Sequence, residues 1–414
     1  MEYIEALGQN AKNAAPLLAG MRAGLKNEIL SEIAKNLSAS KNEIIQANKT
    51  DLENARANGM SEIMQDRLTL NEKRIDGIVE GVEKVIALDD PIGEIIGGNE
   101  LKNGIRIIKK RVPVGVIGII FESRPNVTVD AMALCFKSGN AVILRGGSDA
   151  INSNKALVNI IRRSLAKFGA YENCVQLVED TSHETAEKLM KLNKYVDLLI
   201  PRGSGRLIHT VIEKANIPVI QTGEGNCHVF VDESADLDMA VNIVNNAKTQ
   251  RPSVCNAIES ILVHENIAEA FFKKLDELWN GKVKILGDEA TADLIKVEKI
   301  ADDNDYATEF LDYKLSSKVV KSVDEAIAHI NKFGTGLSEC IVTKSLDNAE
   351  KFQREIDAAA VYVNVSTRFT DGFEFGLGAE IGISTQKLHA RGPMGLRELT
   401  SYKYLINGNG QVRG

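Results

Sequence analysis

The chain has 414 residues, of which 44% are hydrophobic and 26% charged, values that are ordinary for globular proteins and large enough for two or three compact units. Its formal net charge of -7 argues against a nucleic-acid surface, so an anionic substrate would need local cationic sites. The N-terminal segment has no apolar core, so we expect neither a signal nor a transit peptide, and no apolar run is long enough to span a bilayer. Five irregularly spaced cysteines form no disulfide or zinc pattern and favour a reducing cytoplasm, and six scattered histidines indicate no metal site.

The first ninety residues are predicted to be helical. Ser40 and Glu43 have the spacing of a capping box, and Asn71 precedes apolar residues that recur every three or four positions. These apolar stripes predict surfaces that pack against the segments that follow.

From Gly104 the pattern changes to period two. Ile105 and Ile107 alternate with Arg106, and a run of basic residues follows. This alternation predicts an exposed hairpin or arm, which is either solvated or paired with the edge of another subunit.

Between residues 112 and 222 short apolar runs alternate with helical stretches. We expect strands at 114–121, 141–144, 175–178, 196–200 and 219–221, and helices at 127–137, 152–168, 185–192 and 205–215. This alternation predicts a parallel sheet covered by helices on both faces. Such sheets bind ligands at the carboxyl ends of their strands.

Glycine-containing turns follow two of these strands and lead into helices. The segments are Arg145-Gly146-Gly147-Ser148 and Arg202-Gly203-Ser204-Gly205. Glycines let backbone N–H groups approach a phosphate, the helix N-terminus favours an anion, and both arginines add positive charge. Each segment alone is more simply a tight turn, but the two together favour a dinucleotide site. Because the six-residue glycine fingerprint of the Rossmann fold is absent, the cofactor is expected to lie differently.

A second alternating unit begins after Gly225. We expect strands at 228–231, 258–263, 283–286, 340–342 and 360–363, and helices at 237–248, 267–279, 323–332 and 346–355. Pro252 stops the first helix, and the loop that follows presents Cys255. Most free cysteines are buried apolar residues, but a thiol on a loop between two rigid elements is both positioned and reachable. A thiol domain beside a dinucleotide domain suggests hydride transfer to or from a thioester or thiohemiacetal.

The remaining cysteines and the tail have less specific patterns. Cys135 and Cys340 are predicted to lie in the core, and Cys227 is predicted to be a bystander beside the site. A strand is expected at 401–406 with no partner in order along the chain, which suggests pairing with the arm of a neighbouring subunit. For His389 and Arg391 the sequence favours none of three roles, which are packing, capping and contact with a substrate.

The order of these parts resembles the aldehyde dehydrogenase superfamily over nearly the whole chain. Four segments carry the resemblance most specifically: Glu122–Val127, Ile200–Ser204, Ser253–Asn256 and Ser384–Gly395. The resemblance implies an α/β fold of two domains with parallel-rich sheets and a small β oligomerisation arm. It implies an NADPH-binding domain at 1–226 that includes the arm at 97–113, a catalytic cysteine domain at 227–363, a return to the cofactor domain at 364–387 and an oligomerisation tail at 388–414.

The resemblance also implies an activity and its site residues. Cys255 would be the nucleophile in the reduction of L-glutamyl 5-phosphate by NADPH to L-glutamate 5-semialdehyde and phosphate, the second step of proline biosynthesis. Arg145 stands where the superfamily has a lysine at the adenine ribose, and its guanidinium suits the 2'-phosphate of NADPH. Ser204 matches a serine that contacts the pyrophosphate, and Glu309 matches a glutamate near the nicotinamide ribose. The expected cofactor-binding set is completed by Gly146, Gly147, Ser148, Arg202 and Gly203.

Two departures from the superfamily pattern bear on the mechanism. Gln221 replaces the glutamate that activates water in hydrolytic members, and an amide cannot act as that base. Ser123 occupies the position of the oxyanion asparagine and Asn126 lies three residues later, so either could join the Cys255 N–H as donor. Alternatives are a hydrolytic or coenzyme-A-acylating aldehyde dehydrogenase, or a non-catalytic scaffold of this fold. The implied partners are further copies in a dimer or tetramer and, transiently, glutamate 5-kinase.

Overall fold

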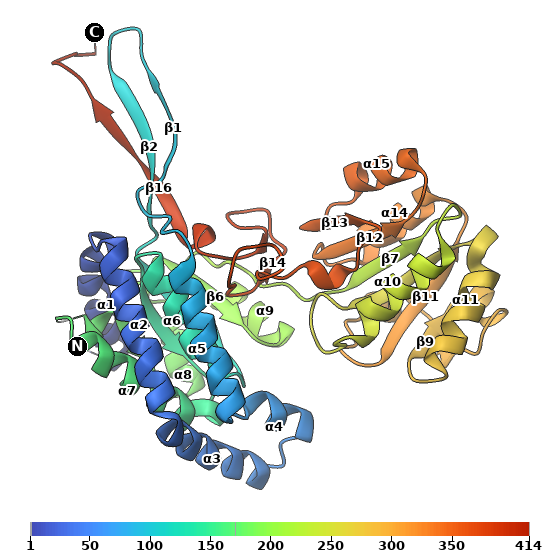
Figure 1. The fold of residues 1–414 in the computed structure, drawn as a ribbon, viewed down its shortest axis with the longest axis horizontal. Coiled ribbons are helices and arrows are strands. Elements are labelled where there is room, and N and C mark those ends of the chain that lie inside the picture. The colour runs from blue at the N-terminus through green and yellow to red at the C-terminus, as the bar shows by residue number, and fades with distance from the viewer. Residues whose placement is uncertain (1, 170, 414) are drawn as a thin grey trace. The chain divides into compact units, whose positions relative to one another are not determined.

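The computed structural model describes residues 2–169 and 171–413 and divides the chain into two compact units. Unit 1 extends to Gln221 and also contains Gly376–Gly382 and the segment from Met394 onwards. Unit 2 consists of Thr222–Phe375 and Ile383–Pro393. Each unit is an α/β body with its own parallel sheet (Figure 1). No helix in the described part of the chain combines the length and the apolar character needed to cross a bilayer.

Helices make up the start of unit 1, as predicted. They are α1 (Tyr3–Ala19), α2 (Ala23–Ala39), α3 (Lys41–Ala57), α4 (Glu62–Leu68) and α5 (Glu72–Ala87). Asn71 caps α5, since its side chain accepts a hydrogen bond from the Arg74 N–H. The predicted capping box at Ser40 is wrong. Ser40 is the single residue between α2 and α3, and it makes no capping bond through its side chain.

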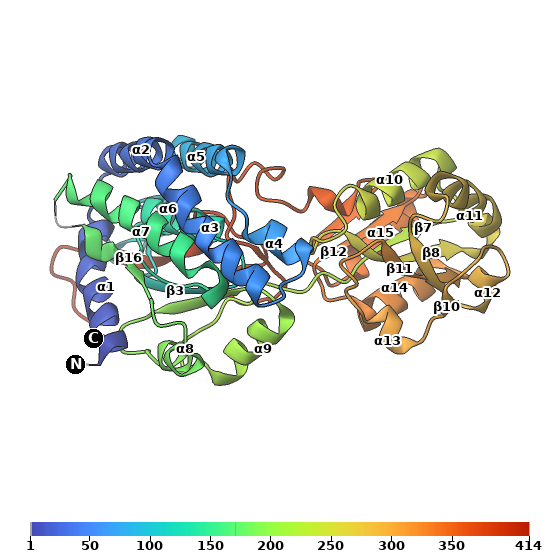
Figure 2. The ribbon, with the colours of Figure 1, turned by 90° about the horizontal axis from the view of Figure 1, so that it is seen from below.

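The sheet of unit 1 is parallel, with strand order β5-β4-β3-β6. Its strands are β3 (Val116–Phe121), β4 (Ala141–Arg145), β5 (Val175–Leu177) and β6 (Leu198–Arg202). The helices between or after them are α6 (Asn126–Lys137), α7 (Ile151–Ala166), α8 (His183–Met190) and α9 (Gly205–Lys214). Figure 2 shows α6 and α7 on one face of this sheet and α8 and α9 on the other, as expected for a doubly covered parallel sheet.

The strand predicted at 219–221 is reduced to a single bridge between Leu199 and Val219. Pro218 has no N–H to donate, and two residues after Ile220 the chain enters unit 2 at Thr222. The segment is therefore too short to form a fifth full strand.

A three-stranded antiparallel ribbon extends from the body of unit 1 (Figure 1). It contains β1 (Ile95–Glu100), β2 (Arg106–Pro113) and β16 (Thr400–Asn407). The hairpin of β1 and β2 confirms the predicted arm. The predicted pairing of the last strand with a neighbouring subunit is wrong, because β16 pairs over its whole length with β2 of the same chain.

The sheet of unit 2 has seven parallel strands in the order β10-β9-β11-β8-β7-β12-β13. They are β7 (Cys227–Val231), β8 (Ile258–His264), β9 (Lys284–Gly287), β10 (Lys299–Ile300), β11 (Lys314–Val320), β12 (Ser338–Val342) and β13 (Ala360–Val363). The helices are α10 (Leu237–Thr249), α11 (Glu265–Trp279), α12 (Glu289–Ala292), α13 (Asp303–Tyr306), α14 (Val323–Phe333) and α15 (Leu346–Glu355). A two-stranded ribbon, β14 (Ile383–Ser384) and β15 (Gly392–Pro393), completes the unit.

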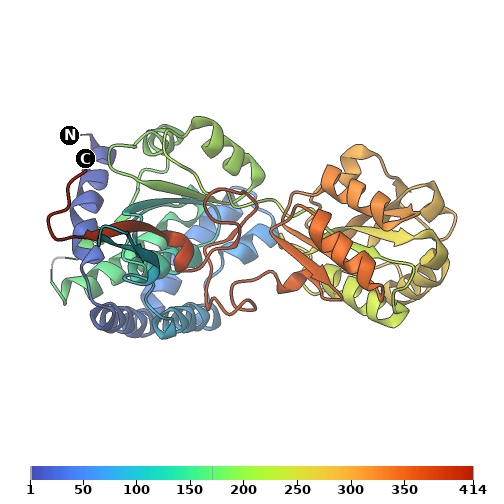
Figure 3. The same cartoon turned by 90° about the horizontal axis from the view of Figure 1, so that it is seen from above.

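Helices lie on both faces of this sheet (Figure 3), and two apolar clusters form the contacts between the strands and the helices. Val229 and Val231 of β7 pack with α10 and α11, whereas Phe230 packs with α14 and α15, so successive side chains face opposite ways. The sequence prediction missed β11, because Ser316 and Ser317 interrupt its apolar pattern although both are buried.

Candidate active site

Cys255 lies on the loop between α10 and β8 and is the one cysteine of the chain that is not buried. The other four are Cys135, Cys174, Cys227 and Cys340. Burial raises the pKa of the Cys174 and Cys340 thiols to about 12, and the thiols of Cys135 and Cys227 are shifted upwards for the same reason. These four thiols therefore stay protonated at neutral pH, and the predicted core positions of Cys135 and Cys340 are confirmed.

The carbonyl of Cys255 is held from two directions. A Cβ added to Gly225 would lie 1.5 Å from the Cys255 carbonyl oxygen, so only glycine allows this approach. Cys227 Sγ donates a hydrogen bond to the same oxygen at 3.2 Å. The Gly225 N–H donates to Glu309 Oε1 at 2.8 Å. Glu309 is therefore bonded to the same glycine that packs against the Cys255 carbonyl.

A short 3-10 helix, η3 (Thr367–Phe369), is bonded to the thiol loop on both sides of Cys255. Asn256 Nδ2 donates to the Thr370 carbonyl at 2.8 Å, and Thr367 Oγ1 donates to the Asn256 carbonyl at 2.7 Å. Arg368 Nε donates to Gln250 Oε1 at 2.8 Å. No sequence motif predicted η3. The one sequence feature that could have indicated a functional role for this segment is Arg368, an arginine in the polar stretch after β13.

Beneath the loop, Lys248 and Glu259 form a fully buried ion pair with an Nζ–Oε2 distance of 2.6 Å. Burial raises the pKa of the Glu259 carboxyl to about 7 and lowers the pKa of the Lys248 ammonium. Glu259 Oε1 also accepts from the Leu311 N–H at 3.1 Å. The pair thus connects the end of α10, the start of β8 and the segment that carries Glu309.

The predicted cofactor residues of unit 1 lie at the carboxyl ends of its strands. Ser204 caps α9, and its N–H donates to Glu122 Oε2 at 2.9 Å. A Cβ on Gly203 would lie 2.5 Å from the same oxygen. A carboxylate therefore sits at the N-terminus of α9, a position where the helix dipole stabilises negative charge. Arg202 is the last residue of β6.

The turn after β4 is similarly close-packed. A Cβ on Gly146 would lie 2.1 Å from Asn154 Nδ2, and one on Gly147 would lie 2.3 Å from Asp149 Oδ1. Ser148 begins a short 3-10 helix, η1 (Ser148–Ala150), that leads into α7. Both glycines therefore pack closely against polar side chains of the segment that follows.

Arg145 ends β4 and is buried. Its Nη2 donates to the Thr181 carbonyl at 2.6 Å, while its buried Nε has no hydrogen-bond partner among residues 2–169 and 171–413. Burial lowers the pKa of the guanidinium, and the carboxylates of Glu122, Asp180 and Asp149 oppose that shift. A buried N–H without a partner fits an oxygen supplied by a ligand, such as a phosphate.

The two candidate oxyanion donors make different hydrogen bonds. Ser123 has a positive φ of 46° and its hydroxyl donates to Asp149 Oδ2. Asn126 begins α6, and its Nδ2 donates to Asp130 Oδ2 at 2.9 Å. Burial raises the pKa of the Asp130 carboxyl to about 6, although the Asn126 hydrogen bond lowers it. Both candidates belong to unit 1 and Cys255 to unit 2, so their roles toward the thiol stay predictions.

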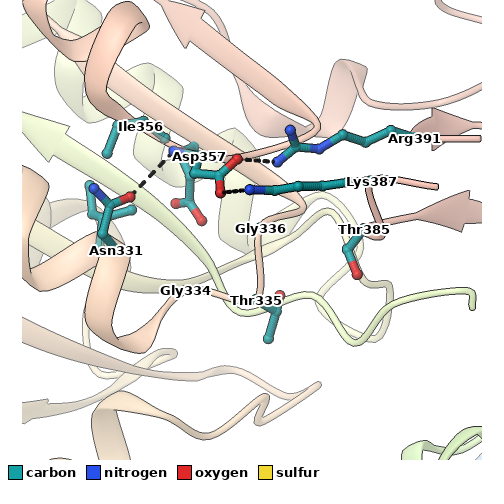
Figure 4. A pocket seen from close by; sticks show the side chains of 11 residues that line it. Asn331, Gly334, Thr335, Gly336, Ile356, Asp357, Thr385, Lys387 and Arg391 are labelled. Carbon is teal, nitrogen blue, oxygen red and sulfur yellow. Dashed lines mark hydrogen bonds and ion pairs between the residues drawn. The ribbon is translucent and has the colours of Figure 1, made fainter.

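Unit 2 also contains a cavity of about 470 Å³ (Figure 4). Asp357, one of the residues that line it, pairs with Lys387 Nζ at 2.5 Å and with Arg391 Nη2 at 2.7 Å. Arg391, for which the sequence left three roles open, is therefore an ion-pair partner, whereas His389 is exposed. Elsewhere in the described ranges no three His, Cys, Asp or Glu side chains gather in a way that could hold a metal ion.

Comparison with known proteins gives consistent matches over the whole chain. The aldehyde dehydrogenase family model matches residues 1–293 and 315–404. The chain is 56% identical over 411 residues to a gamma-glutamyl phosphate reductase of Clostridium beijerinckii, covering 98% of both chains. It is 53% identical over 413 residues to one of Halothermothrix orenii, covering 100% of this chain and 99% of the relative. The crystal structure of gamma-glutamyl phosphate reductase from Thermotoga maritima matches with a TM-score of 0.97 and 49% identity, covering 100% of both chains. This chain therefore belongs to the aldehyde dehydrogenase family, whose fold it has.

Proposed function

We propose that this chain reduces L-glutamyl 5-phosphate to L-glutamate 5-semialdehyde, with release of phosphate, in the second step of proline biosynthesis. The observation that carries the proposal is the full-length similarity, at 53% and 56% identity, to proteins named gamma-glutamyl phosphate reductase. The position of Cys255 supports it, because its thiol is the only one of the five that is not buried and its loop is hydrogen-bonded on both sides.

The Cys255 thiolate acts as the nucleophile. Its sulfur bonds to the acyl carbon of the substrate, the bond from that carbon to the phosphate oxygen breaks, and phosphate leaves with the electron pair. The resulting thioester would be reduced by a hydride, which is the chemistry that a nicotinamide would supply when bound. The carbon–sulfur bond then breaks, which releases the aldehyde and restores the thiolate. Because Gln221 cannot act as a base toward water, the thioester is not hydrolysed.

Asn126 and the Cys255 backbone N–H are the donors that we propose for the oxyanion. The single hydroxyl hydrogen of Ser123 is already donated to Asp149, whereas the amide of Asn126 has a second N–H beside the one donated to Asp130. This difference favours Asn126 over Ser123.

Membership of the family implies a nicotinamide cofactor, and we propose that it is NADPH. The buried Nε of Arg145, which has no hydrogen-bond partner in the described part of the chain, supports a contact with the 2'-phosphate. Ser204 at the start of α9 would contact the pyrophosphate, together with the backbones of Gly146, Gly147, Ser148, Arg202 and Gly203. Glu309 would lie at the nicotinamide ribose, and its bond to the Gly225 N–H would then fix the ribose relative to the thiol loop.

We further propose that the ribbon of β1, β2 and β16 joins copies of the chain. Its β16 strand exposes Tyr402, Tyr404 and Ile406, an apolar set that an intersubunit contact would cover. A transient contact with glutamate 5-kinase would limit loss of the labile acyl phosphate.

The reverse reaction tests the activity with stable reagents. The protein is mixed with glutamate 5-semialdehyde and NADP, and NADPH formation is followed by absorbance with and without phosphate. We expect formation only with phosphate. Formation without phosphate would instead indicate a hydrolytic aldehyde dehydrogenase, and formation only with coenzyme A an acylating one.

Replacement of the nucleophile tests the covalent step. Cys255→Ser should abolish phosphate-dependent NADPH formation, because a serine hydroxyl is not ionised at neutral pH, while NADPH binding followed by fluorescence is retained. Retained activity in this variant would rule out the thioester mechanism.

A further inference from the structure

The cations of unit 2 near the tail motif and the last helix are neutralised by carboxylates. Lys387 and Arg391 share Asp357, and Arg354 pairs with Glu355. Two arginines differ from these. Within residues 2–169 and 171–413, neither Arg251 nor Arg368 has a carboxylate oxygen within 4.0 Å of its guanidinium nitrogens.

Both arginines belong to segments that hold the thiol. Arg251 precedes Cys255 by four residues on the same loop. Arg368 lies in the centre of η3, where its Nε donates to Gln250 Oε1 at 2.8 Å and its carbonyl accepts from Asn256 Nδ2 at 3.4 Å. The backbone carbonyl and the Nε of Arg368 are therefore hydrogen-bonded to residues on either side of Cys255.

The two positive charges act on each other. Burial lowers the pKa of the Arg368 guanidinium, and the nearby charge of Arg251 lowers it further. The carboxylate of Asp371 opposes this shift, and so would a thiolate at Cys255. Arginine stays charged in any case, so an anion that binds here would relieve the repulsion and satisfy guanidinium N–H groups.

The proposed substrate carries anions at both ends, an α-carboxylate and a phosphate, and the chain carries a net charge of -7. Such a protein repels the substrate overall and needs local cations at the site. A planar guanidinium group can donate two parallel hydrogen bonds to two oxygens of the same carboxylate or phosphate. The carboxylate-paired Lys387 and Arg391 are less suited to this role than Arg251 and Arg368.

We propose that Arg251 and Arg368 form an anion subsite beside Cys255, which binds one of the two oxyanion groups of the substrate, either the α-carboxylate or the 5-phosphate. This inference rests on the proposed function, since it assigns the substrate's charged groups to named residues. It leaves the nucleophile and the cofactor site unchanged.

Steady-state kinetics of the reverse reaction separate the two anions, because semialdehyde carries the carboxylate and phosphate is added separately. The variants are Arg251→Ala, Arg368→Ala and Arg368→Lys, and Arg354→Ala is the matched control, an exposed arginine of the same unit. We expect the KM of one ligand to rise about tenfold or more in both alanine variants, the size expected for loss of a charge-assisted hydrogen bond. Arg368→Lys should recover part of the loss, because it keeps the charge without the planar fork.

The pattern of the KM values identifies the anion. A rise for semialdehyde assigns the subsite to the α-carboxylate, and a rise for phosphate assigns it to the 5-phosphate. If both KM values stay within about twofold of wild type, as in Arg354→Ala, or if only kcat falls, the subsite is overturned. Arg251 is exposed, so its variant remains informative if Arg368→Ala disturbs folding.

Alkylation of Cys255 tests the subsite without any turnover. Iodoacetate and iodoacetamide both form a thioether with Cys255 Sγ and displace iodide, but only iodoacetate is an anion. The four buried thiols should not react in the folded protein. We expect the ratio of the iodoacetate rate to the iodoacetamide rate to fall about fivefold in Arg251→Ala and Arg368→Ala, as for the loss of one partly screened charge pair. An unchanged ratio would overturn the proposed subsite. If the ratio changes but the wild-type protein shows no phosphate-dependent activity, only the proposed reaction is overturned.

Discussion

Gly225→Ala should disable the site while leaving most of the fold intact. The added Cβ would lie 1.5 Å from the Cys255 carbonyl oxygen, 2.3 Å from its carbon and 2.7 Å from its Cα. Real Cβ atoms keep about 3.0 Å from such neighbours, so the two backbones must separate by about 1.5 Å. The contact is with backbone and not with the end of a flexible side chain, so no rotamer change can relieve it.

The separation moves Cys255, the proposed nucleophile, directly. Because misplacing a reacting group by about 1 Å costs on the order of 100-fold in rate, we expect kcat of the phosphate-dependent reverse reaction to fall by at least about two orders of magnitude. The overpacking should also lower the free energy of unfolding by about 1–3 kcal/mol. Turnover is measured by NADPH absorbance, and unfolding by urea titration followed by circular dichroism.

Gly77→Ala is the matched control. Gly77 lies inside α5, and a Cβ there would meet no atom within 4 Å. This variant should retain wild-type kcat and gain up to about 1 kcal/mol in stability, since alanine favours a helix over glycine. If Gly225→Ala keeps kcat within about twofold of wild type, the packing of Gly225 on Cys255 does not position the thiol, and our reasoning is refuted.

Three further predictions concern buried charge and cofactor choice. Lys248→Met leaves the buried Glu259 carboxyl unpaired and should lower the free energy of unfolding, measured by urea titration, by about 3–5 kcal/mol. The double variant Lys248→Met with Glu259→Leu should recover most of this loss. If the single and double variants lose the same free energy, the unpaired carboxyl is not the cause. The pKa of Asp130 is raised from 3.8 to about 6, so its contribution to stability is fully present below about pH 4 and is lost as the pH rises to about 6. In Asp130→Asn, the free energy of unfolding measured at pH 4, 5 and 7 should therefore no longer show this decline. If the variant has the same pH profile as the wild type, the pKa of the Asp130 carboxyl is not raised. Arg145→Ala should raise the KM for NADPH far more than that for NADH, and equal increases would exclude a contact with the 2'-phosphate.

Local sequence patterns determined the α/β class and most of the elements. Apolar runs of period two and amphipathic helices are set by neighbouring residues, so the α/β alternation of both units and the loop position of Cys255 could be predicted directly. The helix cap at Asn71 was predictable for the same reason, since a cap involves residues three positions apart. The buried serines of β11 broke this local pattern, and that strand was missed.

Contacts between distant residues were decided only by the tertiary structure. The partner of β16 is β2, about three hundred residues earlier, and no local pattern specifies such a pairing. The close approach of Gly225 to Cys255 and the bonds from η3 to Gln250 and Asn256 likewise join residues far apart in the chain. Cys255 could therefore be proposed as the nucleophile from the sequence, whereas the residues that hold its loop, and the two arginines of the proposed subsite, could be identified only from the folded structure.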